Sequence, residues 1–167
     1  RTFWRYRRNL PSDLTYGASA PVNRGFGMLG ERLFMVTLDA HLLAFDRRNG
    51  DILWDRELAD YQVGYAATLA PLVLEDKIIV GISGGEYRTR GFIDAFDPVS
   101  GERIWRFNTI PGPGEPGSET WPDDPEVLAA GGPRDSARCA RGSASRAPGQ
   151  GACWKHRVAS SRRRFRG

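Results

Sequence analysis

The stretch most able to do chemistry is the loop GISGGEYRTRG at residues 81–91, which places one carboxylate, Glu86, beside two glycines. It stands between two strand-like runs, DKIIV and GFIDAFD, where a two-residue turn would be enough to connect them. Extra residues between paired strands lie on the surface and often carry binding or catalytic groups. This loop is therefore the first candidate for a functional site, and its meaning depends on the elements that position it.

Residues 1–132 alternate short strand-like runs with turn signals and show no helical periodicity of useful length. The runs are rich in β-branched and aromatic residues, and several end at Asn-Gly, Ser-Gly or Pro-Gly. They are RLFMVTL, HLLAFD, DILWDREL, KIIVGIS, GFIDAFD and ERIWRFN. This pattern predicts an all-β fold.

Part of the sequence is repeated. AFDRRNGDILW at residues 44–54 recurs as AFDPVSGERIW at residues 95–105, an offset of 51, and Trp4 precedes Trp54 by 50 residues. A repeat of about 40 to 50 residues with four short strands is typical of a propeller blade, which must stack on its neighbours to bury its faces. We therefore predict a partial β-propeller of about two and a half blades of four-stranded antiparallel sheet, from Thr2 to about Asn108.

The repeat also locates the extra residues of the loop. Upstream of it the two copies align at an offset of 45, from Gly30 and Glu31 onto Glu75 and Asp76, so the change to 51 places six inserted residues within SGGEYRTR. Loops at one end of a propeller face the central channel or a flat end of the ring. An insertion there favours a binding site.

Residues 133–167 differ in composition from residues 1–132. They hold nine Arg, one Lys and one Asp, a net charge of +9 against −5 for the remainder. Two interpretations are open: an Arg-rich tail that binds nucleic-acid phosphates, or translation of the wrong frame of a GC-rich gene. The abrupt change after Gly132 favours the second, so we expect no nucleic-acid partner, a boundary at 132/133 and a disordered tail that lacks apolar periodicity.

Two further classes are limited by composition. No run approaches the roughly 18 apolar residues that a membrane-spanning helix needs, so we expect no membrane span. Both cysteines, Cys139 and Cys153, lie in the tail, so residues 1–132 contain no disulfide that would indicate a compartment.

With the repeat and the loop in view, the chain resembles the pyrroloquinoline-quinone-dependent alcohol dehydrogenases. The resemblance covers nearly all of residues 1–132 and is carried by PVNRG (21–25), ATLAPLV (67–73) and GISGGEYRTRGFIDAFD (81–97) in that order, followed by WRFNTIPGPGEPGSETWP. It implies an eight-bladed propeller with tryptophan docking motifs, of which this chain would be an N-terminal fragment.

The resemblance implies that two residues bind the quinone directly. Arg24, from the VNRG motif, would contact the quinone carboxylates, for which a planar guanidinium is well suited. Thr68, before Ala-Pro in the second motif, would offer its hydroxyl. Each has a plainer interpretation: the alternative for Arg24 is a surface arginine, and the alternative for Thr68 is a residue that completes the hydrogen bonds of a strand end.

By the same resemblance the inserted loop forms a wall of the cofactor site. Ser83 and the backbone of Gly84 and Gly85 would lie against the quinone, because glycine lets the backbone approach a flat ring closely. Glu86 would ligate a calcium ion, which prefers oxygen ligands. The alternative for Glu86 is a solvated loop acid.

This sequence also departs from the family pattern. Many members carry two adjacent cysteines where this chain has Ala18 and Ser19. The family's catalytic Asp base and further calcium ligands come later in its sequence, so residues 1–132 contain no candidate for the base. We therefore predict that this chain alone is inactive.

The activity implied by the resemblance is the oxidation of a primary alcohol to an aldehyde in the periplasm. Pyrroloquinoline quinone and calcium would be the cofactors, and cytochrome c or a membrane quinone would accept the electrons. The alternative is a non-enzymatic propeller scaffold related to outer-membrane assembly lipoproteins, which shares the docking motifs. The combination of VNRG with SGGE argues against it.

Overall fold

The computed structural model describes residues 2–14 and 22–121. The chain divides into two units, Arg1–Arg134 and Asp135–Gly167. The boundary predicted at 132/133 and the tail predicted to be disordered both lie outside the described residues, so they stay predictions.

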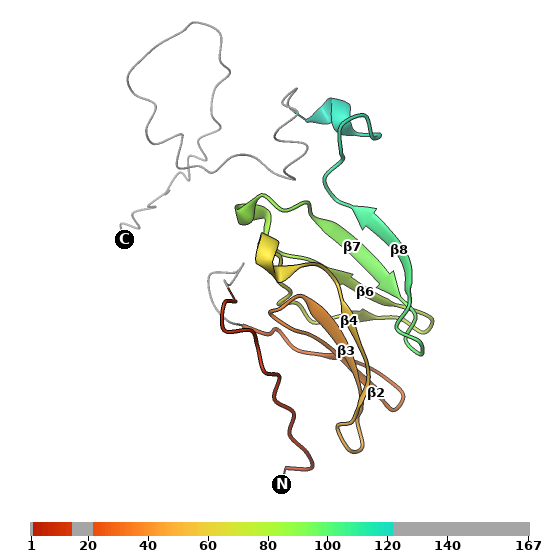
Figure 1. Ribbon diagram of the computed structural model, residues 1–167. Coiled ribbons are helices and arrows are strands. Elements are labelled where there is room, and N and C mark those ends of the chain that lie inside the picture. Colours follow the sequence, from red (N-terminus) through yellow and green to blue (C-terminus); the bar gives the residue numbers. More distant parts are fainter. Residues whose placement is uncertain (1, 15–21, 122–167) are drawn as a thin grey trace, which may run out of the picture. The chain divides into compact units, whose positions relative to one another are not determined.

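Eight strands form two four-stranded antiparallel sheets, labelled in part in Figure 1. The first sheet, blade 1, contains β1 (Gly27–Leu29), β2 (Arg32–Val36), β3 (His41–Asp46) and β4 (Ile52–Glu57). The second sheet, blade 2, contains β5 (Leu72–Val73), β6 (Ile78–Gly81), β7 (Phe92–Phe96) and β8 (Arg103–Asn108). Three single turns of 3-10 helix complete the described elements: η1 (Tyr61–Val63), η2 (Gly85–Tyr87) and η3 (Ser118–Thr120).

Within each sheet every strand pairs with the next along the chain, which is the meander of a propeller blade. The all-β partial propeller predicted from the repeat is therefore confirmed, with two complete blades. The expected additional half blade around Trp4 has a different form, because residues 2–14 contain no strand. This segment instead runs extended along blade 1.

The two blades also share their strand register. Gly27, Phe34, Ala44 and Trp54 stand opposite one another across blade 1, as do Leu72, Ile79, Ala95 and Trp105 across blade 2. Both sheets shift register at the same place, after Ala44 and after Ala95. The repeated sequence therefore specifies the pairing as well as the strands.

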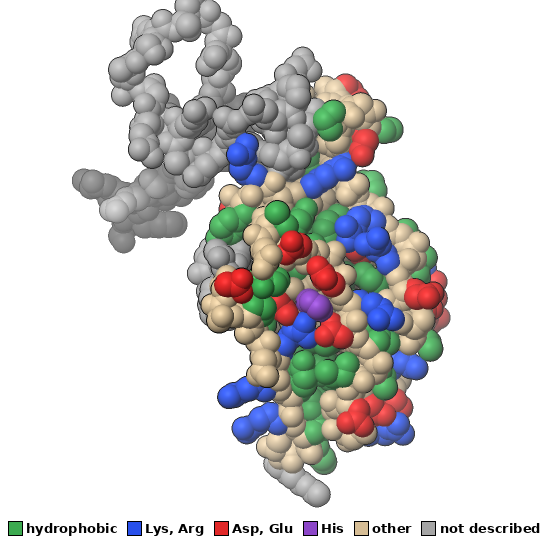
Figure 2. All heavy atoms as spheres, in the orientation of Figure 1, with side chains coloured by type: hydrophobic (Ala, Val, Ile, Leu, Met, Phe, Trp, Pro, Cys, Tyr) green, Lys and Arg blue, Asp and Glu red, His purple; other side chains and the backbone are tan. Residues whose placement is uncertain are grey.

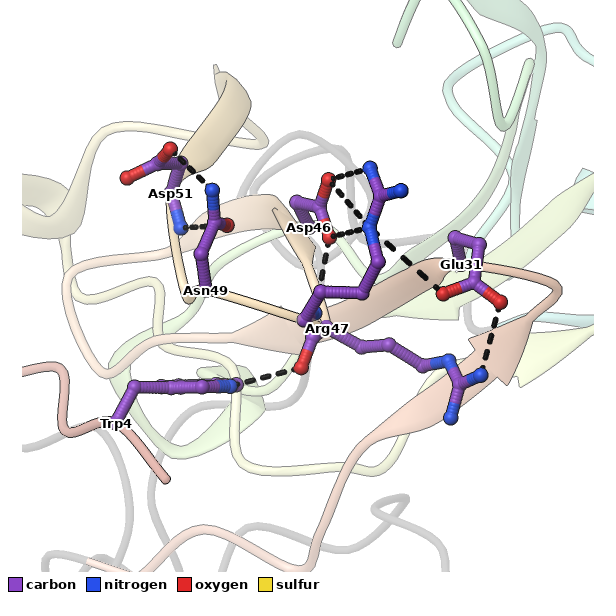
Figure 3. A network of polar contacts seen from close by, with 7 residues as sticks. Trp4, Glu31, Asp46, Arg47, Asn49 and Asp51 are labelled. Carbon is purple, nitrogen blue, oxygen red and sulfur yellow. Dashed lines mark hydrogen bonds and ion pairs between the residues drawn. The ribbon is translucent and has the colours of Figure 1, made fainter. Parts of the chain in front are cut away.

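The tryptophans dock on glycines of the next repeat. A Cβ added at Gly50 would lie 2.6 Å from Cε3 of Trp4, and one added at Gly101 would lie 2.6 Å from Cδ2 of Trp54. Both glycines have positive φ, +82° and +69°, which a hairpin turn of this type requires. Figure 3 shows the indole of Trp4 beside the turn between β3 and β4, where its Nε1 donates to the Arg47 carbonyl at 2.8 Å.

The main hydrophobic core of the described residues lies between the blades. It combines side chains of β2, β3 and β4 with side chains of β6 and β7; its large members include Phe34, Leu42, Trp54, Ile78 and Phe92. Burying a large apolar side chain contributes about 1.5–3 kcal/mol. The inner strands β1 and β5 approach so closely that a Cβ at Gly27 would lie 2.3 Å from Cγ2 of Val73.

The N-terminal segment covers the other face of blade 1 with alternate side chains. The ring centroids of Tyr6 and Phe45 lie 4.8 Å apart, and Arg8 donates to Asp39 and to Asp55 at 2.8 Å each. Nδ1 of His41 lies 2.6 Å from the same Asp55. Figure 2 shows acidic and basic side chains around this histidine, so the segment is held by a charged cluster as well as by Trp4.

Candidate cofactor site

The two blades differ most in the loop between their second and third strands. Residues 37–40 connect β2 to β3, whereas residues 82–91 connect β6 to β7. The longer loop has ten residues against four, and this difference of six equals the insertion expected from the repeat offsets. The inserted loop contains η2 and the predicted site residues Ser83 to Glu86.

The loop is fastened at its first turn through Ser83. Its backbone exchanges two hydrogen bonds with Ala66, at 2.9 and 3.1 Å, and its hydroxyl donates to the Ala66 carbonyl at 2.7 Å. The donor capacity of Ser83 is therefore used within the protein. What it keeps for a ligand is the acceptor capacity of its oxygen.

Gly84 is where the loop backbone comes closest to another segment. Its φ is +136°, and an added Cβ would lie 2.5 Å from both the Gly64 carbonyl oxygen and Oγ1 of Thr89. Its own carbonyl accepts from the amides of Tyr87, at 2.8 Å, and Thr89, at 3.4 Å. A side chain at this position would force the two loops apart.

Gly85 and Glu86 lie on the exposed side of the same turn. A Cβ at Gly85 would meet no described atom within 4 Å. Arg88, with a φ of +68°, closes η2 through its amide, which donates to the Gly85 carbonyl at 3.1 Å. Among the described residues, no hydrogen bond or ion pair engages the Glu86 carboxylate, so its oxygens are available to a ligand.

Arg24 and Thr68 are in direct contact although 44 residues separate them in the sequence. The Arg24 amide donates to the Thr68 carbonyl at 2.9 Å, and its guanidinium Nη1 donates to the Thr68 hydroxyl. Thr68 is buried and Arg24 is exposed. The remaining guanidinium N–H groups meet no acceptor within the described part of the chain, which leaves them able to bind a carboxylate.

Sequence reasoning missed the residue that fastens this pair to blade 1. The Asn23 side chain donates from Nδ2 to the Val36 carbonyl at 2.8 Å, and its Oδ1 accepts from the Gly25 amide at 2.8 Å. Asn23 therefore ties the VNRG segment to the end of β2. The motif held a signal for the Gly25 bond only, because an asparagine side chain often accepts from the backbone amide two residues further on.

One short run of chain links the predicted residues. Thr68 holds Arg24, and Ala66, two residues earlier, holds Ser83. Thus Arg24, Thr68 and Ser83 are brought together. Glu86 makes no hydrogen bond or ion pair with any of them and is exposed on η2.

The donor set suits an anion with an accompanying cation more than a metal alone. Residues 2–14 and 22–121 contain no group of three or more His, Cys, Asp and Glu side chains that could hold a metal ion. Glu86 supplies a single carboxylate. A bound cation would therefore need most of its oxygen ligands from elsewhere, because Ca²⁺ takes about six to eight.

Ala18 and Ser19, at the positions of the family's adjacent cysteines, lie outside the described residues. In the described part, no helix is long and apolar enough to cross a membrane.

The comparison with protein families matches residues 2–134 to the β-propeller domain of glucose, ethanol and alcohol dehydrogenases that use pyrroloquinoline quinone. The chain belongs to this family. The match covers both blades and the inserted loop. It does not favour the alternative of a non-enzymatic scaffold.

Curated relatives agree with the family. The 1-butanol dehydrogenase (quinone) of Thauera butanivorans is 34% identical over 75% of this chain and 23% of its own length. The lanthanide-dependent methanol dehydrogenase of Methylacidiphilum fumariolicum is 36% identical over 66% of this chain and 21% of its own length. The chain thus spans about a fifth of the length of these relatives.

Solved structures show the same fold. A europium-containing methanol dehydrogenase superposes with a TM-score of 0.63 and 37% identity, covering 68% of this chain and 20% of that one. A quinohemoprotein alcohol dehydrogenase from Comamonas testosteroni gives a TM-score of 0.50 with 34% identity over 55% of this chain. The two-blade unit is therefore a piece of a known propeller type.

Proposed function

We propose that this chain is part of a periplasmic dehydrogenase that oxidises a primary alcohol to an aldehyde with pyrroloquinoline quinone and calcium. The electrons pass to cytochrome c or a membrane quinone. The family and the names of the relatives support the reaction class. The structural observation that carries the proposal is the run Ala66–Thr68, which bonds both to Arg24 and to Ser83 at the start of the inserted loop.

Arg24 binds the carboxylates of the quinone in this proposal. Its guanidinium is oriented by the Thr68 hydroxyl and retains unused N–H donors. A planar fork of donors matches a carboxylate. Since the Thr68 oxygen accepts from Arg24, its own hydrogen is left to donate to the ligand.

The inserted loop supplies the second part of the site. Gly85 presents open backbone, and Glu86 presents a carboxylate that no described residue neutralises. A carboxylate is a suitable ligand for calcium or for a harder trivalent ion. When bound, the quinone supplies the electron acceptor and the cation supplies a Lewis acid; the chain's own residues bind and orient them.

Binding of pyrroloquinoline quinone to the purified full chain tests this assignment. Titration in 1 mM calcium should show binding that Arg24→Ala weakens about tenfold or more, because a hydrogen bond to a charged group contributes roughly 1.5–3 kcal/mol. Arg5→Ala, at an exposed arginine of the N-terminal segment, is the matched control and should bind normally. Absence of binding, or equal affinity in Arg24→Ala, would contradict the proposal.

Turnover by the chain alone is not expected. None of the described residues in the site is placed to accept the hydroxyl proton of an alcohol. Chain loaded with quinone and calcium should therefore reduce no dye with methanol, ethanol or longer alcohols. Quinone-dependent turnover above that of a Glu86→Ala control would show that the chain holds a base that we have not identified.

A further inference from the structure

Three successive residues hold the inserted loop along its whole length. Ala66 pairs with Ser83 at the start of the loop, and the Tyr65 hydroxyl donates to the Arg90 carbonyl at 3.1 Å near its end. Gly64 touches the turn between them. Figure 1 shows the corresponding short helices, η1 in yellow and η2 in green, at the same end of the blades.

At the turn, Gly64 and Gly84 allow the two segments to pack closely, because neither has a side chain. A Cβ at Gly64 would lie 2.5 Å from Cβ of Tyr87 and 3.0 Å from its Cγ. In return, a Cβ at Gly84 would lie 2.5 Å from the Gly64 carbonyl oxygen. Neither contact is with the far end of a flexible side chain, so a side chain at either glycine would displace the facing loop.

The backbone amides of the turn bond locally. The amides of Tyr87 and Thr89 donate to the Gly84 carbonyl, and the amide of Arg88 donates to that of Gly85. These bonds shape η2 but do not fix its position on the blade. The run Gly64–Ala66, which continues into Thr68 and its partner Arg24, contacts η2 and both ends of its loop.

We propose that Gly64 is a positioning residue for Glu86, 22 residues further along the chain. The Gly64 contact holds η2 so that the Glu86 carboxylate stands at a fixed place relative to the Arg24 guanidinium. This inference rests on the proposed function, in which a quinone bound by Arg24 and a cation bound by Glu86 share one site.

The test is Gly64→Ala in the full chain, with Gly117→Ala as its matched control. The two glycines have similar φ values, +102° and +92°, but a Cβ at Gly117 would meet no described atom within 4 Å. Both variants therefore carry the backbone penalty of alanine at positive φ, and only Gly64→Ala also displaces the inserted loop.

The readout is quinone affinity measured with calcium and again with a chelator. In the wild-type chain and in Gly117→Ala, calcium should strengthen quinone binding. In Gly64→Ala this gain should fall about tenfold while the affinity in chelator stays unchanged, because Arg24 and Thr68 are untouched. A calcium gain equal to that of Gly117→Ala would overturn the inference alone. A wild-type chain without quinone binding, or without a calcium gain, would overturn the proposed function and the inference together.

If Gly64→Ala does not fold, hydrogen exchange of the wild-type chain tests whether the Gly64 segment and η2 are coupled. The Gly64 amide donates to the Tyr61 carbonyl, and the Tyr87 amide donates to the Gly84 carbonyl. If the loops open as one unit, these two amides should show protection factors of the same order. Protection factors that differ by more than about tenfold would overturn the inference.

Discussion

Blade 1 and blade 2 share strand order, register and bulge but differ in what covers them and in one loop. Blade 1 lies between the N-terminal segment and blade 2, and its β2–β3 connection has four residues. The far face of blade 2 leaves Leu72, Trp105 and Phe107 exposed at 57%, 41% and 62%, and its β6–β7 connection has ten residues. The shared features come from the repeat, whereas the candidate site comes from the place where the repeat is broken.

Trp54 and Trp105 show the difference in covering most clearly. They occupy equivalent places in β4 and β8, yet Trp54 is 8% exposed and lies on Gly101, whereas Trp105 is 41% exposed. The same residue in the same register is therefore a core residue in one blade and a surface residue in the other. What decides its role is the glycine hairpin of a following repeat.

The largest expected effect is a contrast between these two tryptophans. Trp54→Ala should lower the free energy of unfolding by about 3–5 kcal/mol, because it leaves a cavity between the blades. Trp105→Ala should change it by about 1 kcal/mol or less. Urea denaturation measures both, and equal losses would mean that the docking of Trp54 on Gly101 does not hold the blades together.

A second contrast concerns an acid in each blade. Asp94 is fully buried and accepts two hydrogen bonds from Arg106, at 2.7 and 2.6 Å. Arg106 also donates to the carbonyl of Leu58, which follows β4. Asp55 is about one-third exposed and pairs with Arg8 and His41.

Removing these acids should therefore have unequal costs. Asp94→Ala should destabilise the chain by roughly 2–4 kcal/mol, since it leaves a partly buried guanidinium without its partner. Asp55→Ala should cost about 1 kcal/mol or less, as exposed pairs do. Thermal denaturation of both variants at pH 7 is the measurement, and the comparison fails if Asp55→Ala is the more damaging.

Exchanging the connections would separate fold from site. Replacing residues 82–91 with the four residues 37–40 should leave the strands of blade 2 paired, because loop-closure entropy varies slowly with length. It should cost roughly 2–4 kcal/mol of stability, because the hydrogen bonds of Ser83 with Ala66 and of Arg90 with Tyr65 are lost. The same change should abolish the calcium-dependent part of quinone binding by removing Glu86. Loss of the β signal in circular dichroism would show that the insertion is instead needed for folding.

What the sequence could predict also divides into two parts: the features of the repeat, and the contacts between distant segments. The repeat predicted the strands and the six-residue insertion, because these depend on local pattern and on a constant offset. It could not predict that Asn23 bonds to the Val36 carbonyl or that Gly64 makes room for Tyr87. Those contacts join segments that are distant in sequence and depend on individual backbone angles, which no periodicity records.

The smallest expected effect concerns Asp46 and Asp97, which begin the equivalent hairpins. The Arg48 side chain, together with its backbone amide, lowers the pKa of Asp46 from 3.8 to about 2 (Figure 3). The backbone amides of Ser100 and Val99 lower the pKa of Asp97. The lowered pKa of Asp46 in blade 1 therefore comes mainly from an ion pair with an arginine, whereas that of Asp97 in blade 2 comes mainly from the fixed dipoles of backbone amides.

The pKa values of the two aspartates should therefore respond differently to salt. Concentrated NaCl should raise the pKa of Asp46 more than that of Asp97, because salt screens exposed ion pairs. Since both values are depressed, the stabilisation is present above the ordinary carboxyl pKa and is lost as the pH falls through each folded value. Carboxyl ¹³C titrations in low and high salt measure this, and equal shifts would remove the distinction.

The most direct test of the account is the amide NMR spectrum of the ¹⁵N-labelled full chain with pyrroloquinoline quinone and calcium. The account predicts that the largest shifts occur at Arg24, Thr68 and the residues Ser83 to Glu86, and that the amides of the β2–β3 connection, residues 37–40, barely move. Shifts that centre on the far face of blade 2, or that leave the inserted loop unchanged, would contradict the claim that the break in the repeat forms the cofactor site.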